Sequence, residues 1–282
     1  MSDGLEVLSE HRCFGGVQGF YRHASACNGV PMRFAAFRPP QAERGTVPVL
    51  YYFSGLTSTA DNFTIKAGAQ RIAAELGLML VVPDTSPRAT GIPGEADDEE
   101  FGAGAGFYVD ATQAPWSRNF HMYTYVTAEL PAFVGRHFPA DTARESVFGH
   151  SMGGHGALVA ALRNPQRYRS VSALAPISSP MQSRIGRAAF ARYLGADQDA
   201  WKAYDACELV RRQRFPGTIL VDQGEADDHI GGLRPELLRE ACAEAGQALE
   251  FRLHAGYDHS YYFVSTFVED HLRHHARALL SR

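Results

Sequence analysis

Short, unbroken apolar runs alternate along this chain with longer segments in which apolar residues recur at helical spacing. Runs of this kind are typical of strands that helices cover on both faces, and they occupy residues 47–53, 78–84, 170–176, 215–224 and 248–254. The helical pattern occupies residues 61–76, 121–137, 186–214 (in two pieces), 234–246 and 261–280. This alternation predicts βαβ crossovers and an α/β fold with a mostly parallel central sheet.

The N-terminal part of the chain has a different pattern. Residues 11–21 and 31–38 hold short β-type runs separated by turn residues, which predicts an antiparallel N-terminal edge to the sheet. Because no repeat, linker or low-complexity tract interrupts the sequence, we expect a single domain over residues 1–282. In such a sheet, ligands bind at the carboxyl ends of the strands, so functional residues should follow the strands.

The segment 146–163 (SVFGHSMGGHGALVAALR) carries the strongest chemical signal. An apolar run meets Gly-His-Ser-Met-Gly, and small residues at helical spacing follow. A strand, a sharp turn and a helix with Ser151 at the apex form the context of a G-x-S-x-G nucleophile elbow. Side chains at positions 149 and 153 would collide with the neighbouring strand and helix, so both need glycine. The pattern predicts that Ser151 is a nucleophile.

A serine nucleophile needs a base, and the base needs an orienting carboxylate. In the α/β-hydrolase arrangement the acid and then the histidine follow the serine along the chain. The loop after the last strand contains His259, which we favour over His254 at the strand end. For the acid, the loop after strand 215–224 offers Asp227 and Asp228, and spacing alone does not decide between them.

The oxyanion of an acyl-transfer intermediate needs two backbone N–H donors. One donor is expected from the residue after the nucleophile, Met152, and the other from a loop after an earlier strand. The segment SGLTS follows the strand at 47–53, so Leu56 is the best candidate for the second donor.

Other histidines allow competing interpretations. His271, His274 and His275 have a spacing on the terminal helix that could hold a metal. Without a third type of ligand we expect a solvated helix face instead. His150 and His155 flank the elbow, and we expect them to point away from the serine proton and to act as packing or hydrogen-bonding residues rather than bases.

The loop over residues 85–120 is rich in glycine, proline and acid. Its G-x-G-x-G segment is a weak dinucleotide signal because no strand precedes it and no helix follows it. We expect this loop to pack close to the site. The acidic run Asp97–Glu100 is predicted to be a solvated turn rather than a cation site.

Composition excludes several function classes. The net charge of −4 gives no support for nucleic acid as a partner, and no apolar run reaches membrane-spanning length. The N-terminus is polar, without the apolar core of a secretory signal, and the four cysteines are scattered. We therefore expect reduced thiols and a cytoplasmic protein without membrane attachment.

Several stretches together resemble one known family, the S-formylglutathione hydrolases, nearly from end to end. They include CFGGVQGFYRH, SGLTSTADNF, VVPDTSPR, GAGFYVDAT, FGHSMGGHGAL, APISSP, VDQGEAD and GYDHSYYFVSTFVEDHLRHHA. The combination of GHSMGGHGAL with GYDHSYYF is highly specific. The resemblance implies an α/β-hydrolase fold, a cytoplasmic enzyme without cofactor or metal that is often a homodimer, and a small-molecule substrate, the formyl thioester of glutathione, in formaldehyde detoxification.

The resemblance also implies roles for individual residues. It assigns Ser151 as nucleophile, His259 as base and Asp227, rather than Asp228, as the acid. The amides of Leu56 and Met152 carry over as the oxyanion donors.

This chain departs from the family pattern at three places. Ser58 stands where members often have cysteine, so thiol reagents acting there should not inhibit this chain. Glu99 or Glu100 stands where many members have tryptophan, and His229-Ile230 replaces a common Phe-Leu pair after the acid. The change at Glu99 or Glu100 affects the expected pocket wall, and the change at His229-Ile230 affects the packing of the loop that carries the acid.

Three functions remain compatible with the elbow. The first is a thioesterase with a tight acyl pocket, in which Lys66 and Arg118 are candidate contacts for the anionic glutathione. The second is a broad short-chain carboxylesterase or an acyltransferase on the same fold. The third is a catalytically silent binding protein, which the presence of candidates for all three triad roles disfavours.

Overall fold

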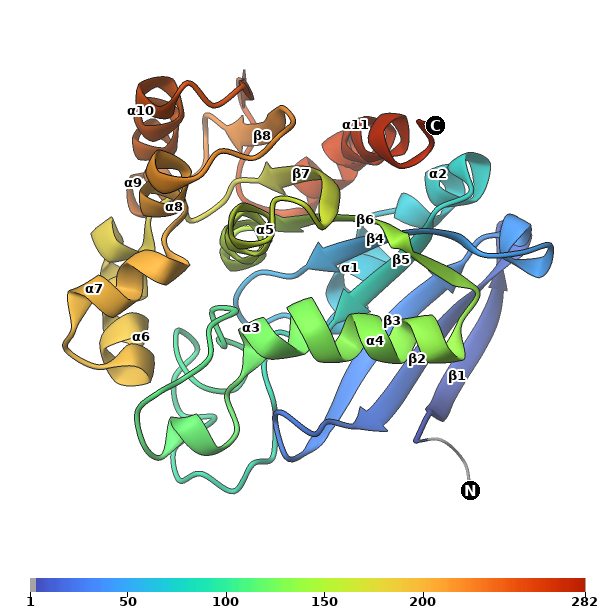
Figure 1. The fold of residues 1–282 in the computed structure, drawn as a ribbon, viewed down its shortest axis with the longest axis horizontal. Helices are drawn as coiled ribbons and strands as arrows, with labels where there is room; N and C mark the ends of the chain where they lie inside the picture. Colours follow the sequence, from blue (N-terminus) through green and yellow to red (C-terminus); the bar gives the residue numbers. More distant parts are fainter. Residues whose placement is uncertain (1–3, 282) are drawn as a thin grey trace.

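The computed structural model describes residues 4–281, within which nine strands form one mixed sheet in the order β1-β2-β3-β5-β4-β6-β7-β8-β9. Neighbouring strands from β5 to β9 are parallel, whereas β1, β2, β3 and β5 pair antiparallel. The expected antiparallel edge is confirmed (Figure 1). The strands are β1 (Glu6–Cys13), β2 (Gly16–Ala24), β3 (Pro31–Arg38), β4 (Val47–Phe53), β5 (Met79–Pro83), β6 (Ala140–His150), β7 (Tyr168–Leu174), β8 (Ile219–Gly224) and β9 (Leu249–His254).

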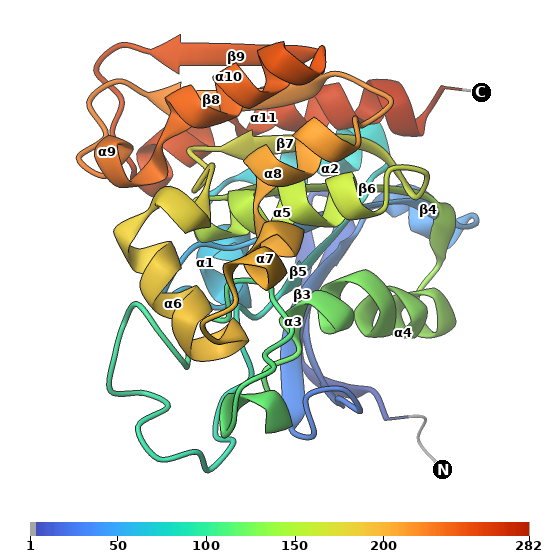
Figure 2. The same cartoon turned by 60° about the vertical axis from the view of Figure 1, so that its left-hand side comes forward.

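Helices cover both faces of the sheet. The α-helices are α1 (Ala60–Lys66), α2 (Ala69–Leu76), α3 (Met122–Thr124), α4 (Leu130–His137), α5 (Met152–Arg163), α6 (Arg184–Leu194), α7 (Gln198–Trp201), α8 (Ala206–Arg212), α9 (Ile230–Leu233), α10 (Pro235–Ala245) and α11 (Tyr261–Leu279). Helices α2 and α11 pack together on one face, and α5 packs on the other with α8 (Figures 1 and 2). The predicted α/β-hydrolase layers are therefore present.

Two predicted elements differ in detail. The run at 11–21 spans a hairpin, since β1 and β2 are separated by a turn at 14–15. The helix expected at 61–76 is two helices, and Gly68 between them has a φ of +69°. Thr59 caps the first of them, α1, and its hydroxyl accepts from the Asp61 amide at 3.2 Å.

The helix expected at 121–137 contains a wider turn before its proline. A π-helical segment, η3 (Tyr125–Glu129), lies between α3 and α4, and Pro131 falls in the first turn of α4. A proline lacks the amide that an α-helical ladder needs, and a local π segment changes the hydrogen-bonding register. The chain therefore stays helical from η3 through Pro131 into α4.

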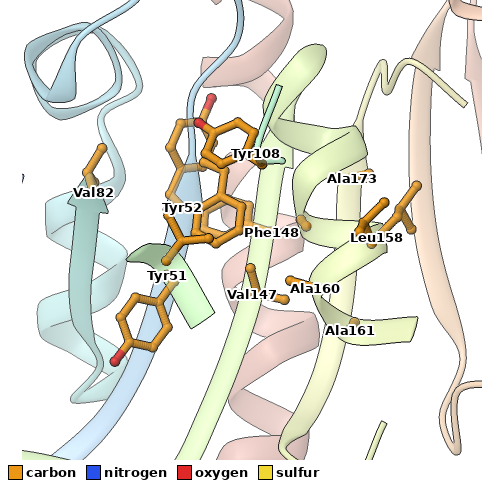
Figure 3. Packing of buried hydrophobic residues seen from close by; sticks show 14 of the residues in the cluster. Tyr51, Tyr52, Val82, Tyr108, Val147, Phe148, Leu158, Ala160, Ala161 and Ala173 are labelled. Atoms are coloured by element: carbon orange, nitrogen blue, oxygen red, sulfur yellow. The ribbon is translucent and has the colours of Figure 1, made fainter. Parts of the chain in front are cut away.

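The core fills both faces of the central strands, because Tyr52 stacks on Phe63 of α1 and Phe148 lies against His275 of α11, opposite the face that α5 covers. Figure 3 shows Tyr51 and Tyr52 of β4 beside Val147 and Phe148 of β6, all fully buried. The buried residues of α5 are mostly Gly, Ala, Leu and Val, so this helix approaches the sheet closely. A Cβ at Gly156 would collide with the ring of Tyr108. Small residues in this helix thus set the close packing beneath the elbow.

The prediction that the histidines of the terminal helix, α11, form a solvated face is wrong. His271 and His275 are fully buried against the sheet. The two ring nitrogens of His275 lie 2.8 Å from the hydroxyls of Ser170 and Ser172 on β7. These histidines satisfy buried strand hydroxyls, and polar residues at helical spacing can face a core when the core is itself polar there.

Two further findings concern the whole described chain. No helix among residues 4–281 is both long and apolar enough to cross a membrane. Cys13, Cys27, Cys207 and Cys242 are all free thiols in the structure.

Candidate active site

Ser151 lies at the turn between β6 and α5. Its φ of 58° and ψ of −121° are unusual for a residue with a side chain, and strain of this kind is characteristic of functional turns. A Cβ at Gly149 would collide with the Gly153 carbonyl, and one at Gly153 would collide with the Phe53 carbonyl. Both glycines are therefore needed for the backbone to turn here.

The loops after β8 and β9 bring an acid and a histidine together. Asp227 Oδ2 lies 2.7 Å from His259 Nδ1. Gln223 Nε2 donates to the same carboxylate oxygen at 2.9 Å, and the His229 amide donates to Oδ1 at 2.8 Å. The carboxylate is thus held in one orientation, with one oxygen directed at the imidazole.

These hydrogen bonds also keep Asp227 ionised. Burial of the carboxyl opposes ionisation, but the hydrogen bonds and charge from His259, with help from the His229 amide and Gln223, outweigh it and lower the pKa of Asp227. An anionic carboxylate on Nδ1 fixes the tautomer in which Nε2 is free to accept a proton.

The alternative acid and base do not form this pair. Asp228 is exposed, and its neighbour Asp227 contacts the imidazole instead. His254 stacks on Phe267 with ring centroids 3.7 Å apart, and its Nε2 lies 3.3 Å from Asp222.

The loop after β4 lies directly against the serine. A Cβ at Gly55 would be 3.1 Å from the Cβ of Ser151. The Thr57 amide donates to the Gly104 carbonyl at 2.9 Å, and Thr57 adopts a φ of 63°. These contacts fix Leu56 on the cavity wall. Met152 begins α5, where backbone amides have no intrahelical acceptor.

A cavity of about 590 Å³ opens above these residues. Its lining includes Ser151, His259 and Leu56, so the residues predicted as nucleophile, base and one oxyanion donor share one space. Apolar side chains on its wall include Ile185, Leu233 and Tyr261. The volume falls within the range of roughly 300–1,000 Å³ that is typical of small-molecule sites.

The two histidines beside the elbow differ from each other. His155 is buried, as expected for a packing residue; its Nε2 lies 3.0 Å from the Phe107 carbonyl, and burial lowers its pKa to about 4. His150 does not point away from the site, because it lines the cavity and its ring centroid lies 4.5 Å from that of His259. Burial, reinforced by the charge on His259, holds the pKa of His150 well below its usual value, so a neutral ring faces the base.

The glycine-rich loop packs close to the site, as expected. Gly104 contacts the Leu56 loop, and the Tyr108 hydroxyl donates to the Ser54 carbonyl at 2.9 Å. The acidic run within the loop is not simply solvated: Asp98 and Glu100 pair with arginines of α6. Among residues 4–281, no cluster of histidine, cysteine and acidic side chains has the geometry of a metal site.

Most of the positions that depart from the family pattern line the cavity, although Ile230 does not. Ser58, Glu99 and Glu100 all form part of its wall. His229 lies edge-on to His259, with ring centroids 5.0 Å apart. These substitutions therefore change the surroundings of the reacting groups.

The two cations that we expected to contact glutathione, Lys66 and Arg118, do not line the cavity. Arg118 is in η2 (Trp116–Arg118) and does not line the cavity. Lys66 does not line it either, although its Nζ lies 5.6 Å from the ring of Tyr261 on the wall. The cation that does line the cavity is Arg184, which sequence reasoning missed because nothing in its local pattern marks it.

Gln223 was also missed by sequence reasoning. Its position at the end of the buried strand β8, four residues before Asp227, was a signal that could have found it, since a buried amide needs partners.

The chain is similar to known esterases over nearly its whole length. The family model described as "Putative esterase" matches residues 25–274. The chain is 53% identical over 281 residues to an S-formylglutathione hydrolase of Paracoccus denitrificans, covering 99% of this chain and 100% of that protein. It is 52% identical over 280 residues to the S-formylglutathione hydrolase of Mus musculus, covering 98% and 99%.

A solved structure shows the same relationship in three dimensions. An S-formylglutathione hydrolase from Agrobacterium tumefaciens superposes with a TM-score of 0.95 at 50% identity, covering 97% of this chain and 99% of that one. The matches span both the elbow and the loops that carry Asp227 and His259. The chain therefore belongs to the S-formylglutathione hydrolase family of α/β-hydrolase-fold esterases.

Proposed function

We propose that this protein hydrolyses S-formylglutathione to glutathione and formate through Ser151, His259 and Asp227. The observation that carries the proposal is the shared cavity: a strained serine and a carboxylate-supported histidine line the same space. Relatives that match over nearly the whole chain bear the name of this activity. The chemistry requires only side chains and backbone amides.

In the first step, His259 Nε2 takes the proton from Ser151 as the Oγ attacks the formyl carbon. The Leu56 and Met152 amides donate to the oxyanion, which develops beside the positive end of the α5 dipole. Asp227 stabilises the imidazolium that forms. The C–S bond then breaks, the sulfur takes the proton from His259, and glutathione leaves a formyl-serine.

In the second step, a water molecule enters the space that the thiol has left. His259 removes a proton from this water as its oxygen attacks the formyl ester. Collapse of the second tetrahedral intermediate breaks the bond to Ser151, whose Oγ recovers the proton from His259, and formate departs. The same base and oxyanion donors thus serve both halves of the reaction.

The formyl group is the smallest acyl group, so the acyl end of the cavity should be tight. We expect kcat/KM to fall as the acyl chain lengthens from formyl to butyryl. A faster reaction with p-nitrophenyl butyrate than with the formyl and acetyl thioesters would contradict the tight pocket.

The decisive experiment measures kcat/KM for S-formylglutathione and for p-nitrophenyl acetate, with wild type and Ser151→Ala. We expect a strong wild-type preference for the glutathione thioester and loss of both activities in the variant, with the fold retained by circular dichroism. Comparable wild-type rates on both substrates would favour a general carboxylesterase. Retained activity in the variant would remove Ser151 from its proposed role.

Three broader properties belong to the same proposal. We propose that the chain acts as a single domain, as a cytoplasmic enzyme and as a homodimer. The free thiols suit a reducing compartment, and the family resemblance supports the dimer. Light scattering coupled to gel filtration would show the mass in solution, and a monomer at working concentration would contradict the dimer.

A further inference from the structure

An ion pair joins two walls of the cavity. Arg184, the first residue of α6, contacts Glu100 of the long loop with 2.6 Å between Nη2 and Oε1. Both residues line the cavity, and their side chains are 77% and 44% exposed. An exposed pair of this kind contributes little to folding and opens at little cost. It is therefore available to exchange partners with a charged ligand.

The charge distribution within the cavity is uneven. Among the lining residues of the described chain, Arg184 is the only lysine or arginine, whereas Glu99, Glu100 and Asp228 supply carboxylates. A ligand with only negative groups would meet more repulsion than attraction here. A ligand that carries a carboxylate and an ammonium on the same carbon would match an adjacent arginine and glutamate.

A second ion pair links the same loop to the same helix outside the cavity. Arg192, on the same helix, contacts Asp98 of the same loop at 3.0 Å, and neither residue lines the cavity. The guanidinium of Arg192 also lies 3.4 Å from the centre of the Phe101 ring, which is buried. The Arg192–Asp98 pair thus fastens the loop to α6 outside the cavity.

We propose that the Arg184–Glu100 pair binds the α-amino-acid end of the γ-glutamyl group of the substrate. The guanidinium takes the α-carboxylate, whose two oxygens match its planar fork, and the Glu100 carboxylate takes the α-ammonium. The substrate inserts its own pair of charges between the two side chains. This assignment rests on the proposed function, because it places the glutathione moiety in the cavity that holds Ser151.

The first test compares four variants, Arg184→Gln and Glu100→Gln against Arg192→Gln and Asp98→Asn. Each control breaks a link between the same loop and helix with the same type of substitution, but outside the cavity. We expect Arg184→Gln to raise KM for S-formylglutathione roughly 10- to 100-fold, as loss of charged hydrogen bonds predicts. Its preference for this thioester over p-nitrophenyl acetate should fall accordingly, while the controls keep the wild-type KM.

The second test changes the substrate. In one thioester 4-aminobutyryl replaces the γ-glutamyl group and removes the α-carboxylate; in another, glutaryl replaces it and removes the ammonium. Wild type should lose affinity for both. Arg184→Gln should be insensitive to loss of the carboxylate, and Glu100→Gln insensitive to loss of the ammonium, because a group cannot lose the same contact twice.

The outcomes separate this proposal from the one on which it rests. If wild type shows no preference for S-formylglutathione over the neutral ester, the proposed function fails. If wild type shows the preference but Arg184→Gln and Arg192→Gln affect KM equally, the ion pair only fastens the loop and this inference fails. A glycinamide analogue of the substrate tests the other end of glutathione, because it lacks the glycyl carboxylate. If Arg184→Gln is insensitive to loss of this carboxylate instead of the α-carboxylate, the γ-glutamyl assignment is overturned.

Discussion

A second serine, histidine and aspartate lie in one hydrogen-bonded row inside the molecule, close in sequence to the proposed triad. His271 Nδ1 lies 2.7 Å from the Ser172 hydroxyl, and its Nε2 lies 3.2 Å from Asp222 Oδ2. This buried row is drawn from β7, β8 and α11, while the acid and base of the proposed triad come from the loops after β8 and before α11. Similar residue types in a similar order thus occur twice.

The surroundings of the two sets differ in every respect that matters for chemistry. Ser172 sits within a regular strand, fully buried, and its hydroxyl also contacts His275. Arg252 pairs with Asp222 at 2.5 Å, and it and His271 overcome the effect of burial to hold the pKa of Asp222 far below its usual value. Because the serine is fully buried and Arg252 balances the charge of the Asp222 carboxylate, we interpret this row as a structural element.

The comparison teaches that hydrogen-bond connectivity does not make a catalytic site. The proposed triad adds a nucleophile held at positive φ, a loop pressed against it and a cavity that admits a substrate. These three additions come from the elbow and from the loops at the carboxyl edge of the sheet. They depend on glycines and turns rather than on the titrating residues themselves.

Replacing each serine by alanine should give the largest contrast. Ser151→Ala should lower kcat by roughly 10⁴- to 10⁶-fold, with little change in unfolding free energy. Ser172→Ala should leave kcat near wild type but destabilise the fold by about 1–3 kcal/mol, because it leaves buried imidazole nitrogens without a partner. Steady-state kinetics and urea unfolding of both variants measure this. Substantial loss of kcat in a folded Ser172→Ala protein would contradict the purely structural role of Ser172.

Replacing each aspartate by asparagine should give the next contrast. Asp227→Asn should lower kcat about 10⁴-fold, since the amide favours the wrong imidazole tautomer. Asp222→Asn should retain kcat and destabilise the protein by at most about 3 kcal/mol, because Arg252 keeps its contact with Asp270 at 2.9 Å. If Asp227→Asn kept more than a tenth of the wild-type kcat, the proposed orienting role would be untenable.

The sequence predicted those parts of the molecule that depend on local chain geometry. Ser151 was recognisable because its turn imposes glycine at fixed offsets, and the α/β-hydrolase arrangement placed the acid and then the base after later strands. Spacing did not separate Asp227 from Asp228, since adjacent residues of one loop differ only in direction. The structure shows which one reaches His259.

Features that depend on distant segments were out of reach of the sequence. The histidines of α11 were interpreted as solvated because their partners, Ser170 and Ser172, are about a hundred residues away in the chain. Arg184 had no local signal because its place in the cavity depends on where the long loop folds back. Polar pairs across the core carry no periodicity of their own, so pattern analysis assigns them to the surface.

The smallest contrast concerns pH and tests His275, which contacts the buried row through the Ser172 hydroxyl. Burial, followed by the charges of His274 and His271, holds the pKa of His275 well below its ordinary value. Below about pH 6.5 the unfolded chain binds a proton at this imidazole and the folded chain does not. The contribution to the unfolding free energy is therefore complete above that pH. It falls as the pH drops below it, by up to about 1.4 kcal/mol per pH unit.

His275→Gln should therefore flatten the loss of unfolding free energy between pH 7 and pH 5, although the variant is less stable at both. His11→Gln, on the exposed strand β1, is the matched control and should keep the wild-type slope. Urea unfolding at several pH values gives the slopes. An unchanged slope in His275→Gln would mean that His275 accepts a proton in the folded state and that its burial against the sheet does not control its charge.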